Sequence, residues 1–394
     1  MSIAPVITAL TAYAGFAVWH ARRQRSRARI VHTRAPAAAG PDAQAATAVD
    51  VIVCCHNEQP QELGRCLSAL AGQRYGGELR VHLVDDGSHR PEEIEREFHR
   101  HAAAGWRLLR LPERRGKRLA QHAAFQDCSA EVIVSVDSDT VIDPGAITAL
   151  VGALDGADVV AATGTVTIQP PLRTVLHRLL DMRYRLLHET GRAAHSFHDA
   201  VLCCGGALTA YRRSALLAVW PDYISQRFRR VACNHGEDMY LTLLLLRPGR
   251  ATRFVPQASA RTQAPRDAGD LLRQQLRWTR SYYRDFVMLL RIVRARPRYL
   301  LADVVAGELL PVMLLLSGAS ALLAGQGLLG WAAVVAPAAL VVDTAVTVYL
   351  TGLGPALCLG YVVIWHWMSL PVRCWALLTL GNQEWGTRGR TPRT

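Results

Sequence analysis

The sequence lacks motifs that would assign it to several common protein classes. It contains no G-x-x-x-x-G-K-[ST] run, so a P-loop nucleotide site is not supported. Its nine cysteines, an odd number, include no C-x-x-C pair, which argues against a disulfide framework and against a zinc site. We therefore expect the bulk of the chain to face a reducing cytoplasm.

The chain also has no basic tract with interleaved aromatic residues of the kind that binds nucleic acid. Its net charge of +13 comes almost wholly from arginines that stand beside apolar segments. Half of the residues are hydrophobic although the mean hydropathy is only +0.10, so the apolar residues are unevenly distributed. This pattern favours a lipid bilayer and anionic small molecules as partners, and no nucleic acid.

Three apolar stretches approach or exceed the length of a membrane-spanning helix. The first, residues 3–19, is followed at once by six arginines between positions 22 and 34. A signal peptide carries its positive charge before the apolar stretch, so this order indicates an anchor, with the chain after it in the cytosol. The other two, residues 300–324 and 331–350, follow an arginine cluster that ends at Arg298.

Acidic residues inside these stretches are costly in a bilayer, which makes Asp303, Glu308 and Asp343 candidates for lining a polar path. Residues 355–380 are apolar but too short for two crossings, so a cytosolic tail would require a re-entrant or interfacial segment. We predict a multi-pass plasma-membrane protein with a large cytoplasmic domain. Its parts are an anchor (residues 1–20), a basic segment with linker (21–48), a cytosolic domain (49–265), an amphipathic interface helix (266–298), two transmembrane helices (299–352), and a re-entrant or interfacial segment with a tail (353–394).

Between residues 49 and 168, apolar β-branched runs alternate with segments of helical spacing. This alternation predicts an α/β domain with a mostly parallel, doubly wound sheet, whose strands end at one common edge. In open α/β sheets ligands bind beyond that edge. The acidic residues that follow the strands there are Glu58, Asp85, Asp86, Asp137 and Asp139.

The clearest of these strand ends is residues 131–140, an apolar run that stops at Asp137-Ser138-Asp139. Paired carboxylates supply the hard oxygen ligands that Mg²⁺ or Mn²⁺ prefers, although a solvated turn gives the same pattern. Residues 114–118 add cations around a glycine at an expected helix N-terminus. There Lys117 and backbone N–H groups would form a diphosphate seat; a merely solvated basic loop is equally consistent.

Two later segments carry side chains suited to act on a sugar. Glu237 and Asp238 precede an apolar helix, where they either cap its N-terminus or place a carboxylate to take a proton from a hydroxyl. On the long amphipathic helix 270–294, Gln274, Arg277 and Trp278 share one face. That face suits a pyranose stacked on the indole, with the guanidinium reaching phosphate.

A run of small residues lies between these sites. Gly205 and Gly206 allow a ligand to approach the backbone closely. Cys203 and Cys204 fit packed positions better than nucleophilic ones, because no histidine partner stands at a readable spacing.

Seven motifs in this order make the chain resemble the processive membrane glycosyltransferases of family 2. This group includes hyaluronan synthases, chitin synthases and, most similar, the rhizobial nodulation N-acetylglucosaminyltransferases that make chitin oligosaccharides. The motifs are Val84-Asp85-Asp86-Gly87-Ser88, Gly116-Lys117-Arg118, Asp137-Ser138-Asp139, Cys204-Gly205-Gly206, Gly236-Glu237-Asp238, Gln274-Gln275-Leu276-Arg277-Trp278 and Trp385-Gly386-Thr387-Arg388.

The resemblance implies a Rossmann-like GT-A fold and a UDP-sugar donor. It assigns Asp238, with Glu237, to catalysis as the general base, and Asp139, with Asp137, to Mg²⁺ or Mn²⁺. It implies acceptor contacts from Cys204, Gly205, Gln274 and Trp278. The nucleotide contacts that it implies are Glu58, Asp85, Asp86, Lys117, Asp137, Arg277 and, from a gating loop, Trp385, Thr387 and Arg388.

The chain departs from the family pattern at three points. Met239 stands where the family usually has arginine, which puts one acceptor or phosphate contact in doubt. Gly206 replaces a frequent proline, which would loosen the acceptor loop. A single N-terminal span matches the nodulation enzymes better than the hyaluronan synthases.

We therefore predict an inverting, metal-dependent transferase that builds a β-linked, chitin-like polymer processively from UDP-N-acetylglucosamine, with a growing polysaccharide as acceptor and coupling to export. The alternative is a hyaluronan synthase that also uses UDP-glucuronate. A non-catalytic membrane scaffold or channel is a rival of a different class. A dolichyl-phosphate type of transferase is disfavoured by the motif at residues 274–278.

Overall fold

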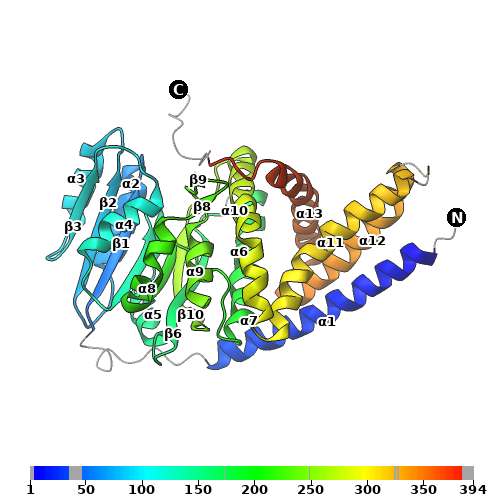
Figure 1. Cartoon of the computed structure of the whole chain (residues 1–394), viewed down its shortest axis with the longest axis horizontal. Helices are drawn as coiled ribbons and strands as arrows, with labels where there is room; N and C mark the ends of the chain where they lie inside the picture. The colour runs from blue at the N-terminus through cyan, green and yellow to red at the C-terminus, as the bar shows by residue number, and fades with distance from the viewer. Residues whose placement is uncertain are drawn as a thin grey trace.

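The computed structural model describes residues 4–34, 47–172, 174–247, 249–323, 325 and 328–383. Within these residues the chain forms an α/β domain from which long helices extend to one side (Figure 1). Three residues that the motifs assign to a gating loop, Trp385, Thr387 and Arg388, lie outside the described residues.

An eight-stranded sheet forms the centre of the α/β domain, in the order β3-β2-β1-β4-β7-β6-β10-β5. The first four strands in this order run parallel, as do β6 and β10, so the predicted mostly parallel sheet is confirmed. β7 and β5 are antiparallel to their neighbours, which the sequence analysis did not predict. The strands are β1 Val49–Cys55, β2 Leu79–Asp86, β3 Arg107–Leu111, β4 Val132–Asp137, β5 Thr140–Ile142, β6 Val159–Ile168, β7 Leu208–Arg212 and β10 Ala251–Thr262; β8 Arg227–Phe228 and β9 Val231–Ala232 form a separate hairpin.

Helices cover both faces of the sheet, because the strands are apolar on both sides and must be shielded from water. On one face, α2, α3 and α5 contribute buried side chains such as Leu67 and Ile147. On the other face, α4, α8 and α9 contribute Phe125, Trp220 and Leu244. These helices are α2 Pro60–Ala71, α3 Pro91–His101, α4 Lys117–Asp127, α5 Ala146–Ala153, α8 Arg213–Ile224 and α9 Glu237–Leu246.

The strand register brings the acidic strand ends together. Cys55 of β1 pairs with Asp85 of β2, and Cys54 of β1 pairs with Asp137 of β4. Because these strands are parallel, their carboxyl ends meet at one edge, and Glu58, three residues beyond β1, extends over the same edge. The sheet therefore places the predicted nucleotide and metal residues side by side.

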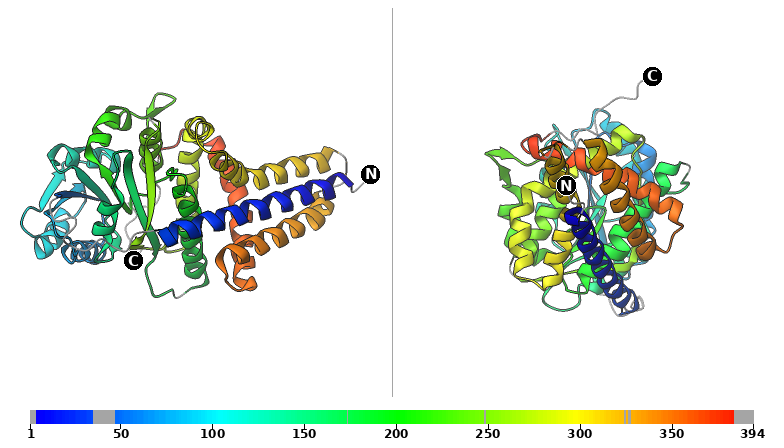
Figure 2. Two further views of the ribbon diagram at one scale, coloured as in Figure 1. Left: turned by 90° about the horizontal axis from the view of Figure 1, so that it is seen from below. Right: turned by 90° about the vertical axis from the view of Figure 1, so that its right-hand side faces the viewer.

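Long helices connect this domain to the extended part of the molecule. α1, α11 and α12 run side by side away from the sheet, whereas α13 lies across their direction and packs against α10 and α12 (Figures 1 and 2). α1 continues without a break through the arginine-rich segment. The bounds are α1 Ala4–Arg34, α6 Val175–Arg185, the π-helix η2 Leu186–Arg192, α7 Ala193–Ser196, α10 Ala268–Arg294, α11 Arg298–Leu323, α12 Leu328–Thr351 and α13 Pro355–Leu378.

Among the described residues, one helix is both long and apolar enough to cross a membrane by length and composition, namely α13. Residues 337–351 of α12 form a shorter apolar helix. α13 covers most of the segment for which the sequence analysis predicts a re-entrant or interfacial position, and the described residues of the three predicted spans lie within α1, α11 and α12. Multi-pass insertion therefore stays a prediction.

The three acidic residues of the extended helices each contact a polar side chain from another helix. This arrangement ties the helices together, a role that the predicted polar path did not include. The contacts are Tyr13 OH to Asp343 Oδ1 at 2.5 Å, His20 Nε2 and His195 Nε2 to Asp303 at 3.0 and 2.7 Å, and Arg373 Nη1 to Glu308 at 2.6 Å.

Candidate active site

Lys117, the only lysine in the sequence, lies at the centre of the candidate active site. Its Nζ atom is 2.6 Å from Asp137 Oδ1, 3.1 Å from Glu237 Oε1 and 3.9 Å from Asp238 Oδ1. Asp137 ends β4, and the other two acids begin α9, about a hundred positions further along the chain. The fold thus brings together residues to which the sequence analysis gave separate roles in nucleotide binding, metal binding and catalysis.

The loop before Lys117 is held in place by Asp86. Gly116 has φ +89°, a conformation that favours glycine, and it precedes the first residue of α4. The Asp86 carboxylate accepts the backbone N–H groups of Arg115 and Gly116 at 2.7 and 2.8 Å. These are N–H groups that the sequence analysis proposed as a phosphate seat, and here they fix the loop so that the Lys117 ammonium meets the acids.

The glycine pair packs closely against both sides of this site. A Cβ atom on Gly206 would lie 2.5 Å from Lys117 Nζ and 2.8 Å from Asp238 Oδ1, so no side chain fits there without displacing them. A Cβ atom on Gly205 would lie 3.1 Å from Arg192 Nη2. Arg192 is buried and ends the π-helix η2, a feature frequent at functional sites that periodicity in the sequence could not predict.

The two neighbouring acids of α9 differ in protonation. Burial raises the pKa of Asp238 to about 7, and the charges of Glu237 and Asp137 add to this while Lys117 opposes it. Burial alone would also raise the pKa of Glu237, but Lys117 and Arg277 hold it at about 2. Although burial alone would lower the pKa of Lys117, the surrounding acids keep it well above its ordinary value. Glu237 is therefore a fixed anion, whereas Asp238, 31% exposed, can exchange a proton near neutral pH.

The remaining strand-end acids lie around this cluster. Glu58 Oε2 accepts a hydrogen bond from the Ser138 hydroxyl at 2.6 Å, which joins the end of β1 to the end of β4. Asp139 Oδ1 lies 3.4 Å from the Thr262 hydroxyl at the end of β10. Asp85 is buried, and its carboxylate accepts the backbone N–H of Ser88 at 3.0 Å. It therefore stabilises the turn that follows β2.

The helix α10, which carries the predicted sugar-binding face, packs against α9. Arg277 is close enough to lower the pKa of Glu237. Trp278 remains 37% exposed, as a ring that stacks on a sugar must be, and Gln274 is half-buried. The side chain that the sequence analysis assigned to phosphate thus pairs electrostatically with an acid in this structure.

The cysteines next to the glycine pair are packed residues. Burial raises the pKa of Cys203 to about 11 and that of Cys204 to about 12. The Cys204 backbone N–H donates to the Thr242 hydroxyl at 2.9 Å. Both thiols stay protonated at neutral pH, in agreement with the prediction that neither is a nucleophile.

The site has the chemical character that a divalent cation requires. Three carboxylates surround one ammonium, and Asp139 stands two residues after Asp137 at the same strand end. Carboxylate and hydroxyl oxygens are the hard ligands that Mg²⁺ or Mn²⁺ takes. Asp137 and Asp139 therefore fit the predicted metal, with Asp137 shared between the cation and Lys117.

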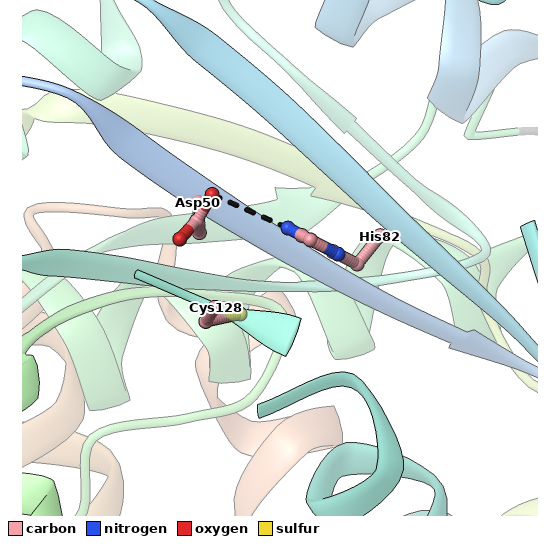
Figure 3. A group of neighbouring side chains, drawn as sticks. All are labelled: Asp50, His82 and Cys128. Atoms are coloured by element: carbon pink, nitrogen blue, oxygen red, sulfur yellow. Dashed lines mark hydrogen bonds and ion pairs between the residues drawn. The ribbon is translucent and has the colours of Figure 1, made fainter. Parts of the chain in front are cut away.

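A second group of potential ligands, Asp50, His82 and Cys128, lies at the opposite end of the strands (Figure 3). Its ligand atoms lie within 4.8 Å of one another, but the Asp50 carboxylate already accepts the backbone N–H groups of Ser129 and Ala130. The guanidinium of Arg80 lies 2.8 Å from it. Burial also raises the pKa of the Cys128 thiol to about 12, so this cluster is an internal ion pair and does not suit a metal.

Replacing Asp50 by asparagine should destabilise the protein by about 3 kcal/mol, because Arg80 would lose a fully buried anionic partner. Burial alone would raise the pKa of Asp50, but its hydrogen bonds and Arg80 lower it to about 2. Its stabilising effect is therefore complete above about pH 4 and is lost as the pH falls through 2. The apparent melting temperature at pH 7 measures the change. Asp143→Asn, in an exposed pair with Arg261, is the control and should shift it little; an equal shift in both variants would contradict the assignment.

The chain is similar to known proteins in sequence and in fold. A family model described as glycosyltransferase-like family 2 matches residues 46–281. An N-acetylglucosaminyltransferase of Sinorhizobium fredii strain NGR234 is 38% identical over 97% of this chain and 94% of its own length. One of Mesorhizobium japonicum is 37% identical over 90% and 86%. A mannosyltransferase from Pyrobaculum calidifontis, solved with GDP-Man and Mn²⁺, superposes with a TM-score of 0.62 over 92% of this chain and 97% of that one, at 21% identity.

Proposed function

Because the chain belongs to the family 2 glycosyltransferases, we propose that it transfers N-acetylglucosamine from UDP-N-acetylglucosamine to a growing β-linked, chitin-like saccharide. The observation that carries this proposal is the convergence of Asp137, Glu237 and Asp238 within 3.9 Å of the Lys117 ammonium. The N-acetylglucosaminyltransferase names of the rhizobial relatives support the choice of donor.

The reaction is a single displacement that inverts the anomeric centre. The Asp238 carboxylate takes the proton of an acceptor hydroxyl, and the hydroxyl oxygen forms a bond to the anomeric carbon as the bond to the diphosphate breaks. UDP leaves with the electron pair of that bond. The Lys117 ammonium neutralises charge on the departing diphosphate, and Glu237 keeps Lys117 in place through a 3.1 Å ion pair.

Mg²⁺ or Mn²⁺ would be held by Asp139 and Asp137, and when bound it neutralises phosphate charge. The Mn²⁺ in the structurally similar mannosyltransferase supports this assignment. The acceptor would stack on Trp278, which is exposed on α10, a helix that packs against the base-bearing helix α9. Glu58, Asp85 and Asp86 would lie toward the nucleoside.

Membrane attachment and processive export are part of the same proposal. Apolar α13 and exposed apolar residues along the extended helices, such as Trp19, Val341 and Leu378, support contact with lipid. The proposed location is the plasma membrane, with the α/β domain in the cytoplasm beside the arginine-rich part of α1.

An assay with membranes that contain the protein tests the function. UDP-N-acetylglucosamine alone should yield UDP and a chitinase-sensitive saccharide, and EDTA should stop both until Mg²⁺ or Mn²⁺ is added back. A polymer that forms only when UDP-glucuronate is also present would replace this proposal by the hyaluronan synthase alternative. If no UDP is released with any of these donors, the result would instead support a non-catalytic scaffold or channel.

A further inference from the structure

The loop that leads into Glu237 and Asp238, the catalytic pair, is held by Arg284 of α10. His235 is 1% exposed, two residues before Glu237. Arg284 Nη2 donates to the His235 carbonyl oxygen at 2.8 Å and to its Nδ1 atom at 2.9 Å. The same guanidinium nitrogen lies 3.0 Å from the Ser281 hydroxyl. One side chain thus fixes both the backbone and the ring of His235.

The protonation of His235 follows from this contact. Arginine has only donors, so Nδ1 must accept and the ring must be neutral with its proton on Nε2. Burial, followed by the charge of Arg284, lowers the pKa of His235 to about 3, in agreement with a neutral ring. The Nε2–H then faces the carbonyl oxygen of Asn382 at 3.4 Å. His235 therefore connects Arg284 to the chain that follows α13.

The other arm of Arg284 holds that same chain. Arg284 Nη1 donates to Gln383 Oε1 at 2.7 Å, and the backbone N–H of Asn234 donates to the same oxygen at 3.1 Å. Arg280, one turn earlier on α10, donates to the Thr379 hydroxyl at 3.0 Å. Residues 379–383 are thus attached both to α10 and to the loop before the catalytic pair, although they lie far from that loop in the sequence.

The segment between His235 and the catalytic acids has little room to move. Gly236 separates His235 from Glu237 and has φ +84°, a left-handed conformation. A Cβ atom there would lie 2.4 Å from the Ser281 hydroxyl oxygen, so the loop is pressed directly onto α10. A displacement of His235 must therefore move the N-terminus of α9 and with it Asp238.

We propose that Arg284 and Gln383 are positioning residues that hold the base-bearing loop in its reactive place by joining it to the end of α13. Neither residue touches the Lys117 cluster in the described contacts, so both act through His235 and Gly236. The inference rests on the proposed role of Asp238. If these contacts hold the base in place, the position of α13 affects the rate of turnover. A small displacement of Asp238 from the acceptor hydroxyl would be enough to slow proton transfer.

Gln383→Leu tests the proposal, because leucine has a similar size but cannot accept the two hydrogen bonds. We expect kcat to fall about tenfold to a hundredfold while KM for UDP-N-acetylglucosamine changes less than about twofold. The acid limb of kcat should move to lower pH, because a loosened loop exposes Asp238 to water and relieves the burial that raises its pKa. Gln383→Glu restores an acceptor opposite Arg284 and should recover most of kcat.

Arg291→Gln, an exposed charge loss on the same helix, is the matched control and should leave kcat unchanged. Melting temperatures of all variants identify any that fail to fold. A normal kcat in Gln383→Leu, or an equal loss in Gln383→Leu and Gln383→Glu, would overturn the inference. Failure of the proposed function has a different signature, since the unaltered protein would then not transfer N-acetylglucosamine or Asp238→Asn would keep full turnover.

Discussion

Replacement of Lys117 by methionine should lower kcat by about a thousandfold or more. The methionine has nearly the same length but no charge, so nothing of the protein would neutralise the departing diphosphate at this position. The three carboxylates within 3.9 Å of Nζ would also lose their shared partner and repel one another. The effect should fall on the chemical step, because the ammonium is needed most when the diphosphate leaves.

Single-turnover rates and UDP binding separate these effects. Binding of UDP should weaken far less than the chemical step slows, because we propose that other strand-end residues also contact the nucleotide. Lys117 lowers the pKa of Asp238, so its removal should shift the acid limb of residual activity to higher pH.

Lys117→Arg is the charge-matched control for this experiment. It should restore only part of the rate, because Gly206 leaves no room beside Nζ for a larger fork. Methionine at position 117 with unchanged kcat would show that the ammonium is structural.

The sequence was sufficient to predict the edge at which the site lies. β2 and β4, which end at Asp86 and Asp137, are parallel neighbours of β1. Parallel strands that are buried on both faces have a continuous apolar pattern that can be recognised locally. The sequence alone therefore predicts that the acids at their ends lie together. Their order along the chain also matched the family pattern, which supplied the role of Asp238.

What the sequence could not predict depends on contacts between distant segments. Asp86 is 29 residues from Arg115, yet it fixes the loop that presents Lys117. Arg284 meets Gln383 99 positions away, and no periodicity relates them. β10 was missed because Pro256 interrupts its strand pattern, and its register with β6 shifts between Val255 and Ser259.

Protonation is likewise set by three-dimensional surroundings. Glu237 and Asp238 are adjacent acids at the start of one helix. The family resemblance assigns the base to Asp238, but nothing in the local sequence explains physically why the two acids should differ. Lys117 Nζ lies 3.1 Å from Glu237 but 3.9 Å from Asp238, and this difference helps to separate the pKa values of the two acids. The folded arrangement therefore supplies the physical reason why Asp238, and not Glu237, is ready to accept a proton.

The rate of transfer should rise with pH through about 7 and then level off, because Asp238 must be deprotonated to act as base. Below that pH the carboxyl holds its proton and cannot accept the one from the acceptor hydroxyl. An ordinary aspartate would be ionised across this range, so a limb near 7 reports the burial and the neighbouring acids that raise the pKa of Asp238. The profile of kcat from pH 5 to 9 under saturating donor measures it.

Asp238→Asn should abolish the rise of kcat with pH near 7 and lower kcat by at least about a thousandfold, while UDP still binds. Glu237→Gln is the matched control on the same helix turn, since it also removes one negative charge near Lys117. Because Glu237 has a pKa of about 2, its loss cannot abolish a limb near 7. It should instead shift that limb to lower pH, since its charge is one of the causes that raise the pKa of Asp238. If Asp238→Asn turned over normally, or if the limb persisted in it, the proton would have to go to another group at the edge of the sheet.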